Sequence, residues 1–499
     1  MRLGKAMQKW LVLAHRWLAI GMCLLFVGWF ISGLVLMYVA FPNLNGRERA
    51  AGLARIEWQR VRVLPDEALR LSGVTEFPHE LRLEMMGAEP VYRIQDDASP
   101  TTVSARTGRV VRSVSAVQAG DIAEQFMRTA GPVTVETIVR DQWTVSTAFD
   151  IDRPLHVVQF DDADATHLYV SSRDGAIVLD TTAHERRWNW IGAVTHWIYF
   201  SDLRTHPAAW RQVVLWLSGI GIVVAISGIW LGIDRLRVRP GPGGSITPFR
   251  GWAAWHHLAG VLGGVFVLTW IFSGWLSMDP PGPWSSDPDM QRIRAGVAAY
   301  RAHDAPDFAM SLDVLRALDG RDIRTAAFAW LGGKPRVVLV DSEGASKVLA
   351  ADSGAPVDLR AQDLIAAARG LVPGAHLLDA IVLGEPDAYW YSHREERPLP
   401  VLRLRFDDEP RSWIYLDPVS GAVLTRIDAS QRLHRWLFNA LHSFDFRWLL
   451  AQRPLWDIAM WVLMSAGLFL SLSGVVMGVR RLRRLWRGAV ATRTLRIHT

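Results

Sequence analysis

The chain contains four long apolar stretches without Asp, Glu, Lys or Arg, at residues 17–41, 212–233, 251–278 and 458–479. A helix needs about 20 apolar residues to cross a hydrocarbon core of about 30 Å, and each stretch is long enough. Buried helices of soluble proteins seldom run this far without a charge, so the pattern predicts four transmembrane helices. The first stretch is too long for a signal peptide and no A-x-A-like cleavage site follows it, so we interpret it as a retained anchor.

Two long segments, 42–209 and 279–454, separate the apolar stretches and read as short alternating strands with turns between them. Helical patterns such as 363–368 lie among the strands. This mixture favours a small α+β module in each segment. The clearest predicted strands are 168–170, 401–406 and 413–417, and the turns after the first and the last of these end at Gly175 and Gly421.

The basic residues gather in the N-terminal arm, in the link between the second and third helices, and in the C-terminal tail. These three segments hold fifteen Lys and Arg but one acidic residue, Asp234, although the net charge of the 499-residue chain is only +6. Lys and Arg favour the cytoplasmic side of a membrane. We therefore expect a multi-pass protein of the bacterial inner membrane, with both termini in the cytoplasm and both long segments in the periplasm.

The expected architecture is a polytopic α-helical membrane protein whose four transmembrane helices form two parallel-oriented repeats, each with a periplasmic α+β domain. Its parts are a cytoplasmic arm and first helix (1–41), a periplasmic domain with an interfacial segment (42–209), the second helix (210–233), a basic cytoplasmic loop (234–250), the third helix (251–278), a second periplasmic domain with an interfacial segment (279–454), the fourth helix (455–479) and a basic cytoplasmic tail (480–499).

Composition and motifs narrow the partners and the chemistry. Anionic lipid headgroups explain the basic segments, so membrane lipid is an expected partner and nucleic acid is not. The single cysteine, Cys23, allows no disulfide and no cysteine metal site within one chain. The chain has no H-E-x-x-H, no G-x-S-x-G, no Walker A loop and no dinucleotide fingerprint after a strand. Any electrons must therefore come from a separate partner or from membrane quinol.

The two halves of the chain repeat one pattern. The spacings that define the repeat are 17 residues from His15 to Ser32-Gly33 and from His256 to Ser273-Gly274, and 31 residues from His196 to Ser227-Gly228 and from His442 to Ser473-Gly474. Between these anchors, Arg153-Pro154-Leu155 aligns with Arg397-Pro398-Leu399, and Phe160-Asp161-Asp162 aligns with Phe406-Asp407-Asp408. Each half crosses the membrane twice, so a pseudo-twofold axis along the membrane normal relates the halves. Equivalent residues then face each other at equal depth.

This symmetry predicts two pairs of histidines, His15 with His256 near the cytoplasmic surface and His196 with His442 near the outer surface. Ionisable groups inside membranes usually mark a functional path. Neutral imidazole is a good axial ligand for haem iron, and two imidazoles from facing helices can hold a haem in a bundle core. One bis-histidine haem near each surface, two in all, forms an electron path across the bilayer.

Four further residues are weaker candidates for the same sites. Arg16 and Arg435 are placed to meet haem propionates, or to snorkel to the interface. His257 points about 100° away from His256 on a helix, and the repeat selects His256. His434 has no histidine counterpart in the first half. Glycines that leave room for a macrocycle, or for close helix packing, are Gly21, Gly260, Gly263 and Gly264. Histidines of the long segments that we expect at the surface are His79, His156, His167, His303, His376 and His393.

In these features the chain resembles the PepSY-associated transmembrane family, whose members include iron-regulated inner-membrane proteins and ferric-siderophore reductases. The matching residues are His15-Arg16-Trp17-Leu18 and His256-His257-Leu258-Ala259-Gly260 at the openings of the first and third helices, Thr195-His196 and Leu441-His442 ahead of the second and fourth, the Ser-Gly pairs, and Asp417-Pro418-Val419-Ser420-Gly421 at the end of a PepSY-like module. The resemblance covers nearly the whole chain, strongly in the membrane parts and loosely in the long segments.

The resemblance implies b-type haem held by His15, His196, His256 and His442, with the haem iron as the bound metal. It also implies that the two periplasmic domains are PepSY-like. The sequence departs from the family where Thr195 replaces the usual leucine, and His257 stands as the counterpart of Arg16. The outer ligand set and the choice between His256 and His257 therefore stay open.

Two functions follow from these observations. The first is a haem-containing oxidoreductase that passes electrons from quinol or a cytoplasmic reductase to a periplasmic acceptor such as a ferric-siderophore or another ferric chelate. Reduction weakens the hold of hard-oxygen ligands on iron, so the chelate releases it. The alternative is a non-enzymatic scaffold or regulator whose PepSY-like domains bind a peptide, a peptidase or a transporter.

Overall fold

The chain divides into two units that alternate along the sequence. The computed structural model describes residues 5–96, 100–129, 133–239, 244–282, 284–285, 288–393 and 396–497. The helical unit consists of Met1–Phe41, Arg187–Ser285 and Gln431–Thr499, and the sheet unit of Pro42–Arg186 and Ser286–Ser430. The predicted basic loop and basic tail include residues 240–243 and 498–499, which lie outside the described residues.

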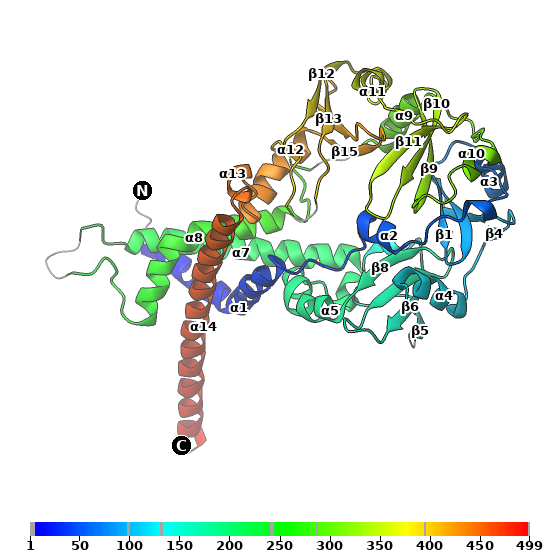
Figure 1. Ribbon diagram of the computed structural model, residues 1–499. Coiled ribbons are helices and arrows are strands. Elements are labelled where there is room, and N and C mark those ends of the chain that lie inside the picture. The colour runs from blue at the N-terminus through cyan, green and yellow to red at the C-terminus, as the bar shows by residue number, and fades with distance from the viewer. Residues whose placement is uncertain are drawn as a thin grey trace. The chain divides into compact units, whose positions relative to one another are not determined.

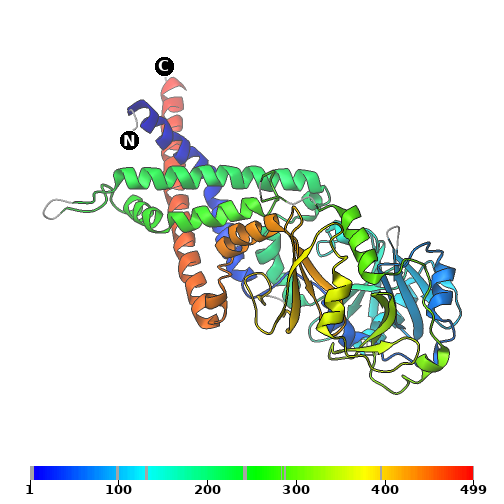
Figure 2. The ribbon, with the colours of Figure 1, turned by 90° about the horizontal axis from the view of Figure 1, so that it is seen from above.

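Four long helices form the helical unit, α1 (Lys5–Leu36), α7 (Pro207–Arg235), α8 (Trp252–Leu276) and α14 (Arg453–Ile497). All four are long and apolar enough to cross a membrane, as the sequence predicts, and the protein has the features of a membrane protein. Neighbouring helices contact each other in the order α1, α7, α8, α14 and back to α1, and α7 and α8 lie side by side in Figures 1 and 2. The two helices that open each half, α1 and α8, are therefore diagonal partners in the bundle.

Local sequence explains where these helices begin and end. Pro207 occupies the first turn of α7, where its missing N–H costs no hydrogen bond. Gly251, with a φ of 57°, precedes α8, and glycine adopts such a conformation without steric cost. The α14 helix continues past its apolar stretch into the basic tail. We call the end of the bundle at which α7 leads into Arg235 and α14 into Arg480 the basic end, and the opposite end the far end.

Equivalent short helices precede α7 and α14. Those of the first half are α5 (Ala183–Asn189), η3 (Trp190–Val194) and α6 (Ser201–Arg204), and those of the second half are α12 (Ala429–Arg435), η4 (Trp436–Ala440) and α13 (Arg447–Leu450). Both η3 and η4 are π-helical. Soon after them, Ile198 and Phe444 have positive φ angles of 53° and 52°. The repeat thus reproduces two rare backbone features at the same positions.

The sheet unit contains fifteen strands among the described residues. They are β1 (Glu80–Met86), β2 (Glu89–Gln95), β3 (Pro100–Ser104), β4 (Val110–Val111), β5 (Val133–Ile138), β6 (Leu155–Phe160), β7 (His167–Ser171), β8 (Ile177–Thr181), β9 (Thr325–Leu331), β10 (Lys334–Val340), β11 (Ser346–Ala350), β12 (Leu377–Leu383), β13 (Val401–Phe406), β14 (Trp413–Leu416) and β15 (Val423–Ile427). The helices of this unit are α2 (Gly46–Gly52), η1 (Trp58–Arg60), α3 (Pro65–Ser72), α4 (Ala116–Met127), η2 (Thr147–Phe149), α9 (Met290–Arg301), α10 (Leu312–Arg316) and α11 (Ala361–Ala368).

The two long segments share one sheet. Its strand order is β11-β10-β9-β1-β2-β3-β4, and β1 pairs with β9 in antiparallel register, Arg82 opposite Ala327. Strands β9, β10 and β11 repeat β1, β2 and β3, so a local twofold axis passes between Arg82 and Ala327. The segments therefore form one joint unit instead of the two separate domains expected from the sequence. The interfacial segments after Arg186 and after Ser430 belong to the helical unit.

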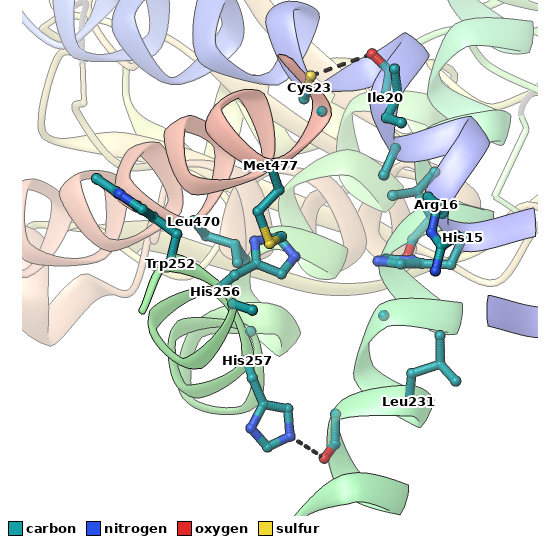
Figure 3. Close-up of a pocket in the computed structure, with 18 of the residues that line it drawn as sticks. His15, Arg16, Ile20, Cys23, Leu231, Trp252, His256, His257, Leu470 and Met477 are labelled. Carbon is teal, nitrogen blue, oxygen red and sulfur yellow. Dashed lines mark hydrogen bonds between the residues drawn. The ribbon is translucent and has the colours of Figure 1, made fainter. Parts of the chain in front are cut away.

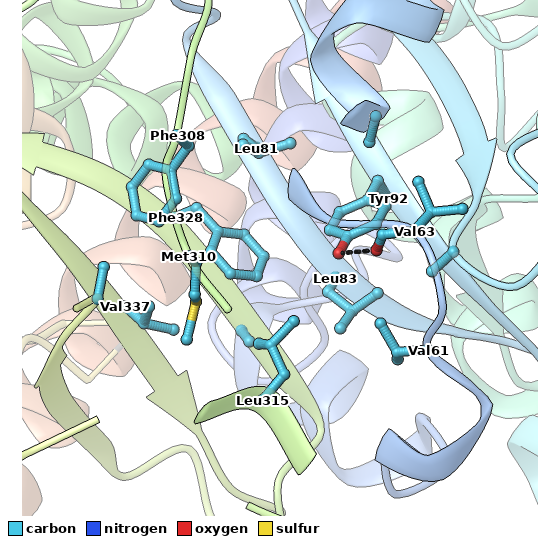
Figure 4. Close-up of a cluster of buried hydrophobic side chains, with 14 of the residues drawn as sticks. Val61, Val63, Leu81, Leu83, Tyr92, Phe308, Met310, Leu315, Phe328 and Val337 are labelled. Atoms are coloured by element: carbon cyan, nitrogen blue, oxygen red, sulfur yellow. Dashed lines mark hydrogen bonds between the residues drawn. The ribbon is translucent and has the colours of Figure 1, made fainter. Parts of the chain in front are cut away.

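Burial explains why the segments join. Figure 4 shows Leu83 and Tyr92 of the first segment packed with Phe328 of the second, and all three are buried. The Tyr92 hydroxyl donates a hydrogen bond to the Val63 carbonyl at 2.8 Å, so its polar atom is satisfied within the core. Pairing β1 with β9 makes one continuous apolar face from the two segments and buries more apolar surface than either segment alone.

Each half also contributes its own four-stranded antiparallel sheet, β5-β6-β7-β8 or β12-β13-β14-β15. The predicted strands at β7, β13 and β14, the helix at α11 and both glycine turns are confirmed. One alignment was wrong by two residues. Strands β6 and β13 begin at Leu155 and Val401 and end at Phe160 and Phe406, so Leu155 corresponds to Val401 and not to Leu399. The Arg-Pro-Leu resemblance is a coincidence of sequence.

Candidate functional site: two histidine pairs in the helix bundle

The four predicted histidines lie at two levels of the bundle. His15 of α1 and His256 of α8 line one cavity at the basic end. His196 and His442, each two residues after a π-helical turn, meet at the far end, where their ring centroids are 5.9 Å apart with 76° between the planes. The structure therefore brings each predicted pair together, since the residues come from diagonal elements that both face the bundle axis.

Every one of these imidazoles contacts the serine of a Ser-Gly pair on the other helix of its own half. The Nδ1 to Oγ distances are 3.1 Å for His15 and Ser227, 2.9 Å for His196 and Ser32, 2.8 Å for His256 and Ser473, and 2.9 Å for His442 and Ser273. Within a half, α1 or α8 thus supplies one histidine and one serine, and their partners are a serine on α7 or α14 and a histidine in the short helical segment that precedes it. Sequence reasoning used these serines only as markers of the repeat.

The serine hydroxyls define which nitrogen carries the proton. Each hydroxyl donates to a carbonyl of its own helix, as Ser227 does to Val224 at 3.0 Å and Ser473 to Leu470 at 2.6 Å. Ser32 and Ser273 make the same kind of bond. A hydroxyl has one proton, so a serine that donates it to the carbonyl accepts from the imidazole, and this arrangement assigns the hydrogen to Nδ1. Nε2 then presents a lone pair, the form of histidine that ligates metals.

The basic-end pair supports this assignment independently. The Nδ1 of His15 also lies 3.2 Å from the Val224 carbonyl, which can only accept a hydrogen bond. Across the residues that the structure describes, the Nε2 atoms of His15 and His256 make no hydrogen bond. These two nitrogens are therefore available to a ligand in the cavity.

The glycine after each serine lies beside the imidazole, and at Gly228 the imidazole approaches too closely for a Cβ. A Cβ at Gly228 would lie 2.8 Å from Cε1 of His15, which is closer than van der Waals contact permits. At Gly274 and Gly474 the same atom would lie 3.7 Å from Cε1 of His442 and His256. Of the glycines predicted to leave room for a macrocycle, Gly260 and Gly264 line the cavity, and Gly264 also packs closely on Ile229 of α7.

The cavity at the basic end has a volume of about 800 Å³ and is lined by residues from all four long helices. Cofactor and ligand pockets generally measure about 300–1,000 Å³. Figure 3 shows His15 and His256 on opposite sides of this space, with Met477 beside His256 and Arg16 beside His15. A flat apolar group with a metal at its centre fits the volume of this cavity, and the imidazoles of His15 and His256 can ligate that metal from its two sides.

His257 lies in the same cavity wall but is engaged elsewhere. Its Nε2 donates to the Gly232 carbonyl at 2.8 Å, as Figure 3 shows, and its ring contacts Phe249. Because this contact uses Nε2, His257 attaches α8 to α7, while His256 makes the repeat-equivalent contact with Ser473. The geometry thus distinguishes two neighbours that the sequence left open.

Arg16 lines the same cavity, and the two remaining weaker candidates, His434 and Arg435, lie at the far end. His434 packs on Phe438 in a tilted arrangement, with ring centroids 5.3 Å apart, and Phe438 stacks on His442 in turn. His434 is therefore separated from the histidine pair by an aromatic ring. Arg435 is buried, donates to the Asp445 carbonyl and lies 4.2 Å from the centroid of the Trp436 ring.

The histidines expected at the surface include one error. His156 is only 5% exposed, and its two nitrogens contact Thr137 at 2.9 Å and the Val114 carbonyl at 2.8 Å. It is a core residue of strand β6, buried because α4 and the preceding loop cover that face of the sheet.

The donor set limits the kind of metal group that fits. Among the described residues, no group of three or more His, Cys, Asp or Glu side chains is arranged to hold a bare metal ion. The two histidine pairs offer two imidazoles each, which suits a metal whose other ligands come from a macrocycle. Comparison of the sequence with family models and with curated proteins finds no match.

Proposed function

We propose that this chain is a haem-containing inner-membrane oxidoreductase that moves electrons to a periplasmic acceptor. The observation that carries the proposal is the set of four imidazoles, paired at two levels, each with Nδ1 beside a serine hydroxyl, together with the Nε2 atoms of His15 and His256, which are available to a ligand in the cavity at the basic end. In metalloproteins the non-ligating nitrogen of a histidine ligand is commonly fixed by such a partner. Nothing in ordinary helix packing requires this arrangement four times.

His15 and His256 hold one haem b in this proposal, and His196 and His442 hold the other. When bound, each haem supplies a one-electron redox centre. Along α1, the 17 residues from His15 to Ser32 span about 25 Å at 1.5 Å per residue. The two levels are therefore separated by a distance close to the hydrocarbon thickness of about 30 Å, with one pair near each surface.

A buried apolar cluster of the bundle includes Phe26, Phe30, Trp270, Met460 and Met464. It extends from the cavity at the basic end, which Phe26 lines, to the far-end pair, where the Trp270 indole N–H donates to the His442 carbonyl at 2.9 Å. An apolar interior of this kind opposes the passage of ions and protons beside the redox centres, because unpaired charges are costly there.

The acceptor and donor in this proposal are chosen by chemistry. A ferric-siderophore or other ferric chelate suits a periplasmic site, since one electron converts ferric iron to a form that hard-oxygen ligands bind less tightly. The donor is quinol or a cytoplasmic reductase. The resemblance to PepSY-associated reductases supports the same assignment.

The test is the absorption spectrum of the full chain purified in detergent, with haem counted per chain. We expect a Soret band, a reduced α band of b type and two haems. His15→Ala or His256→Ala removes one haem, His196→Ala or His442→Ala removes the other, and the exposed His206→Ala serves as control. Absence of both bands overturns the proposal and favours the scaffold or regulator.

A further inference from the structure

The charged residues in the wall of the cavity at the basic end are all positive. Six arginines line it, Arg16, Arg235, Arg250, Arg480, Arg481 and Arg484, and no Asp or Glu is among the lining residues. They come from α1, from the end of α7, from the link before α8 and from α14. Four separate parts of the chain thus direct like charges at one space, which is unfavourable unless an anion binds there.

Among the described residues, a protein carboxylate pairs with one of these six arginines. Arg235 contacts Asp234 at 3.4 Å. In the part of the chain that the structure describes, the other five make no ion pair and no side-chain hydrogen bond. Arginine presents a planar fork of donors that matches a carboxylate in two parallel hydrogen bonds. The set is therefore prepared for a ligand with more than one carboxylate.

The helix α14 presents its arginines to the cavity by its periodicity. Arg480, Arg481 and Arg484 share one side of the helix and line the cavity. Leu482, Leu485 and Trp486, spaced three and four residues apart, occupy the opposite side and are exposed. An apolar face with a tryptophan favours the lipid interface. Lipid contact on that side keeps the arginine side turned inward.

The rest of the wall is apolar and specifies the body of the ligand. Val12, Ile20, Val224, Ile229 and Leu470 line the cavity beside the histidines. An inorganic phosphate has no apolar surface to bury against them, and a neutral quinone offers carbonyl acceptors but no negative charge to balance the arginines. The combined wall suits a large flat apolar body with carboxylates on one edge.

We infer that Arg480, Arg481 and Arg484, together with Arg16, bind the two carboxylates of the macrocycle held between His15 and His256, and fix its carboxylate edge toward the basic end of the bundle. This rests on the proposed function, because it names what holds the other edge of the same group. It also gives the tail arginines a role beyond membrane orientation.

The experiment separates carboxylate binding from iron ligation. The full-length chain is purified in detergent from cells that cannot make haem, then titrated with metal-free protoporphyrin IX or with its dimethyl ester, following quenching of tryptophan fluorescence. We expect the diacid to bind roughly tenfold tighter than the ester or more, since each charge-assisted hydrogen bond favours it. Arg480→Gln/Arg481→Gln/Arg484→Gln removes that preference and leaves ester binding unchanged.

The matched control is Arg483→Gln/Arg487→Gln, which removes charge from the same helix but at positions outside the cavity lining. It keeps the full preference for the diacid. If the triple variant keeps the preference, or the unmodified chain shows none, the inference is overturned. If excess anionic phospholipid, but not neutral phospholipid, abolishes diacid binding, the arginines bind lipid phosphate and the inference is also overturned.

Failure of the proposed function has a different signature. In that case the haem-replete chain shows no b-type spectrum, and His15→Ala/His256→Ala changes nothing. The preference of the metal-free diacid over its ester depends on the arginines alone, so it persists in the His15→Ala/His256→Ala variant if the present inference is correct.

Discussion

The Nδ1 atom of His256 in α8 lies 2.8 Å from the hydroxyl of Ser473 in α14, although 217 residues separate them in sequence. The same contact occurs at three other places in the bundle, always between residues of one half. Since the hydroxyl proton is already donated to the helix backbone, the serine acts as an acceptor and fixes the tautomer of the histidine. Serine, glycine and histidine thus form one repeated unit.

Replacing Ser473 tests the acceptor role. In Ser473→Ala, His256 loses the group that fixes its ring, and we expect haem affinity at the basic end to fall about 10- to 100-fold, as is typical when a ligand's outer partner is removed. The control is Ser471→Ala, two residues earlier on α14, because Ser471 is buried and lines the cavity, and its hydroxyl donates to the Gly467 carbonyl at 2.8 Å. Haem retention during gel filtration measures the effect. Equal losses in both variants would argue that the serine contact is incidental.

Gly228 tests the close approach of imidazole to helix. In Gly228→Ala the new methyl group would lie 2.8 Å from Cε1 of His15, so the ring must rotate away from Ser227. We expect loss of the basic-end haem signal with the far-end signal intact. Gly219→Ala on the same helix has no atom within 4 Å of the new methyl group and is the control. Low-temperature spectra that resolve the two haems provide the measurement, and an unchanged spectrum in Gly228→Ala would contradict the prediction.

Glu84 tests a buried charge cluster in the sheet unit. Its carboxylate contacts Arg49 at 3.3 Å, Arg82 at 3.1 Å and Arg93 at 2.9 Å. Burial alone would raise the pKa of Glu84, but the three guanidinium groups lower it well below its usual range. Removing one partner of a buried ion pair costs about 3–5 kcal/mol, and we expect Glu84→Gln to destabilise the sheet unit by that amount.

The measurement for Glu84 is urea unfolding of the full chain at several pH values. A carboxyl group whose pKa is lowered by folding stabilises the protein above the unfolded pKa of about 4.3 and loses that contribution as the pH falls toward the folded pKa. The difference between Glu84→Gln and the unmodified chain is therefore constant near neutrality and shrinks in acid. Glu57→Gln, which removes an exposed pair with Arg60, is the control and costs less than about 1 kcal/mol.

For Asp152 we expect folding stability to depend on pH in the opposite direction. Partial burial, and then repulsion from Asp174, raise the pKa of Asp152 to about 6. A carboxyl group with a raised pKa opposes folding once it ionises, so its cost grows as the pH rises from about 4 through 6. We expect Asp152→Asn to stabilise the sheet unit at pH 8 by about 1 kcal/mol, allowing for solvent screening, and to have little effect at pH 4. Thermal unfolding at both pH values checks this, and equal effects at both would contradict it.

The sequence was sufficient for several features because their causes are local. An apolar run of 20 residues inserts in a membrane whatever its neighbours do, and alternation in 401–406 specifies a strand that the structure confirms as β13. Equal spacings also identified His15 and His256 as equivalent without any knowledge of helix packing. The alignment of Leu155 with Leu399 was wrong because three matching residues can recur by chance, whereas the two ends of a strand define its position in the fold.

The sequence by itself determined the four membrane-length helices, the duplication, and which four histidines occupy equivalent positions in the two halves. Only the tertiary structure decided which serine each imidazole contacts, that β1 pairs with β9, and that arginines from four parts of the chain line one cavity. The physical reason is that hydropathy and spacing act along the chain. Hydrogen bonds between residues about 200 positions apart depend instead on how each helix is rotated against its neighbours, and packing sets that rotation.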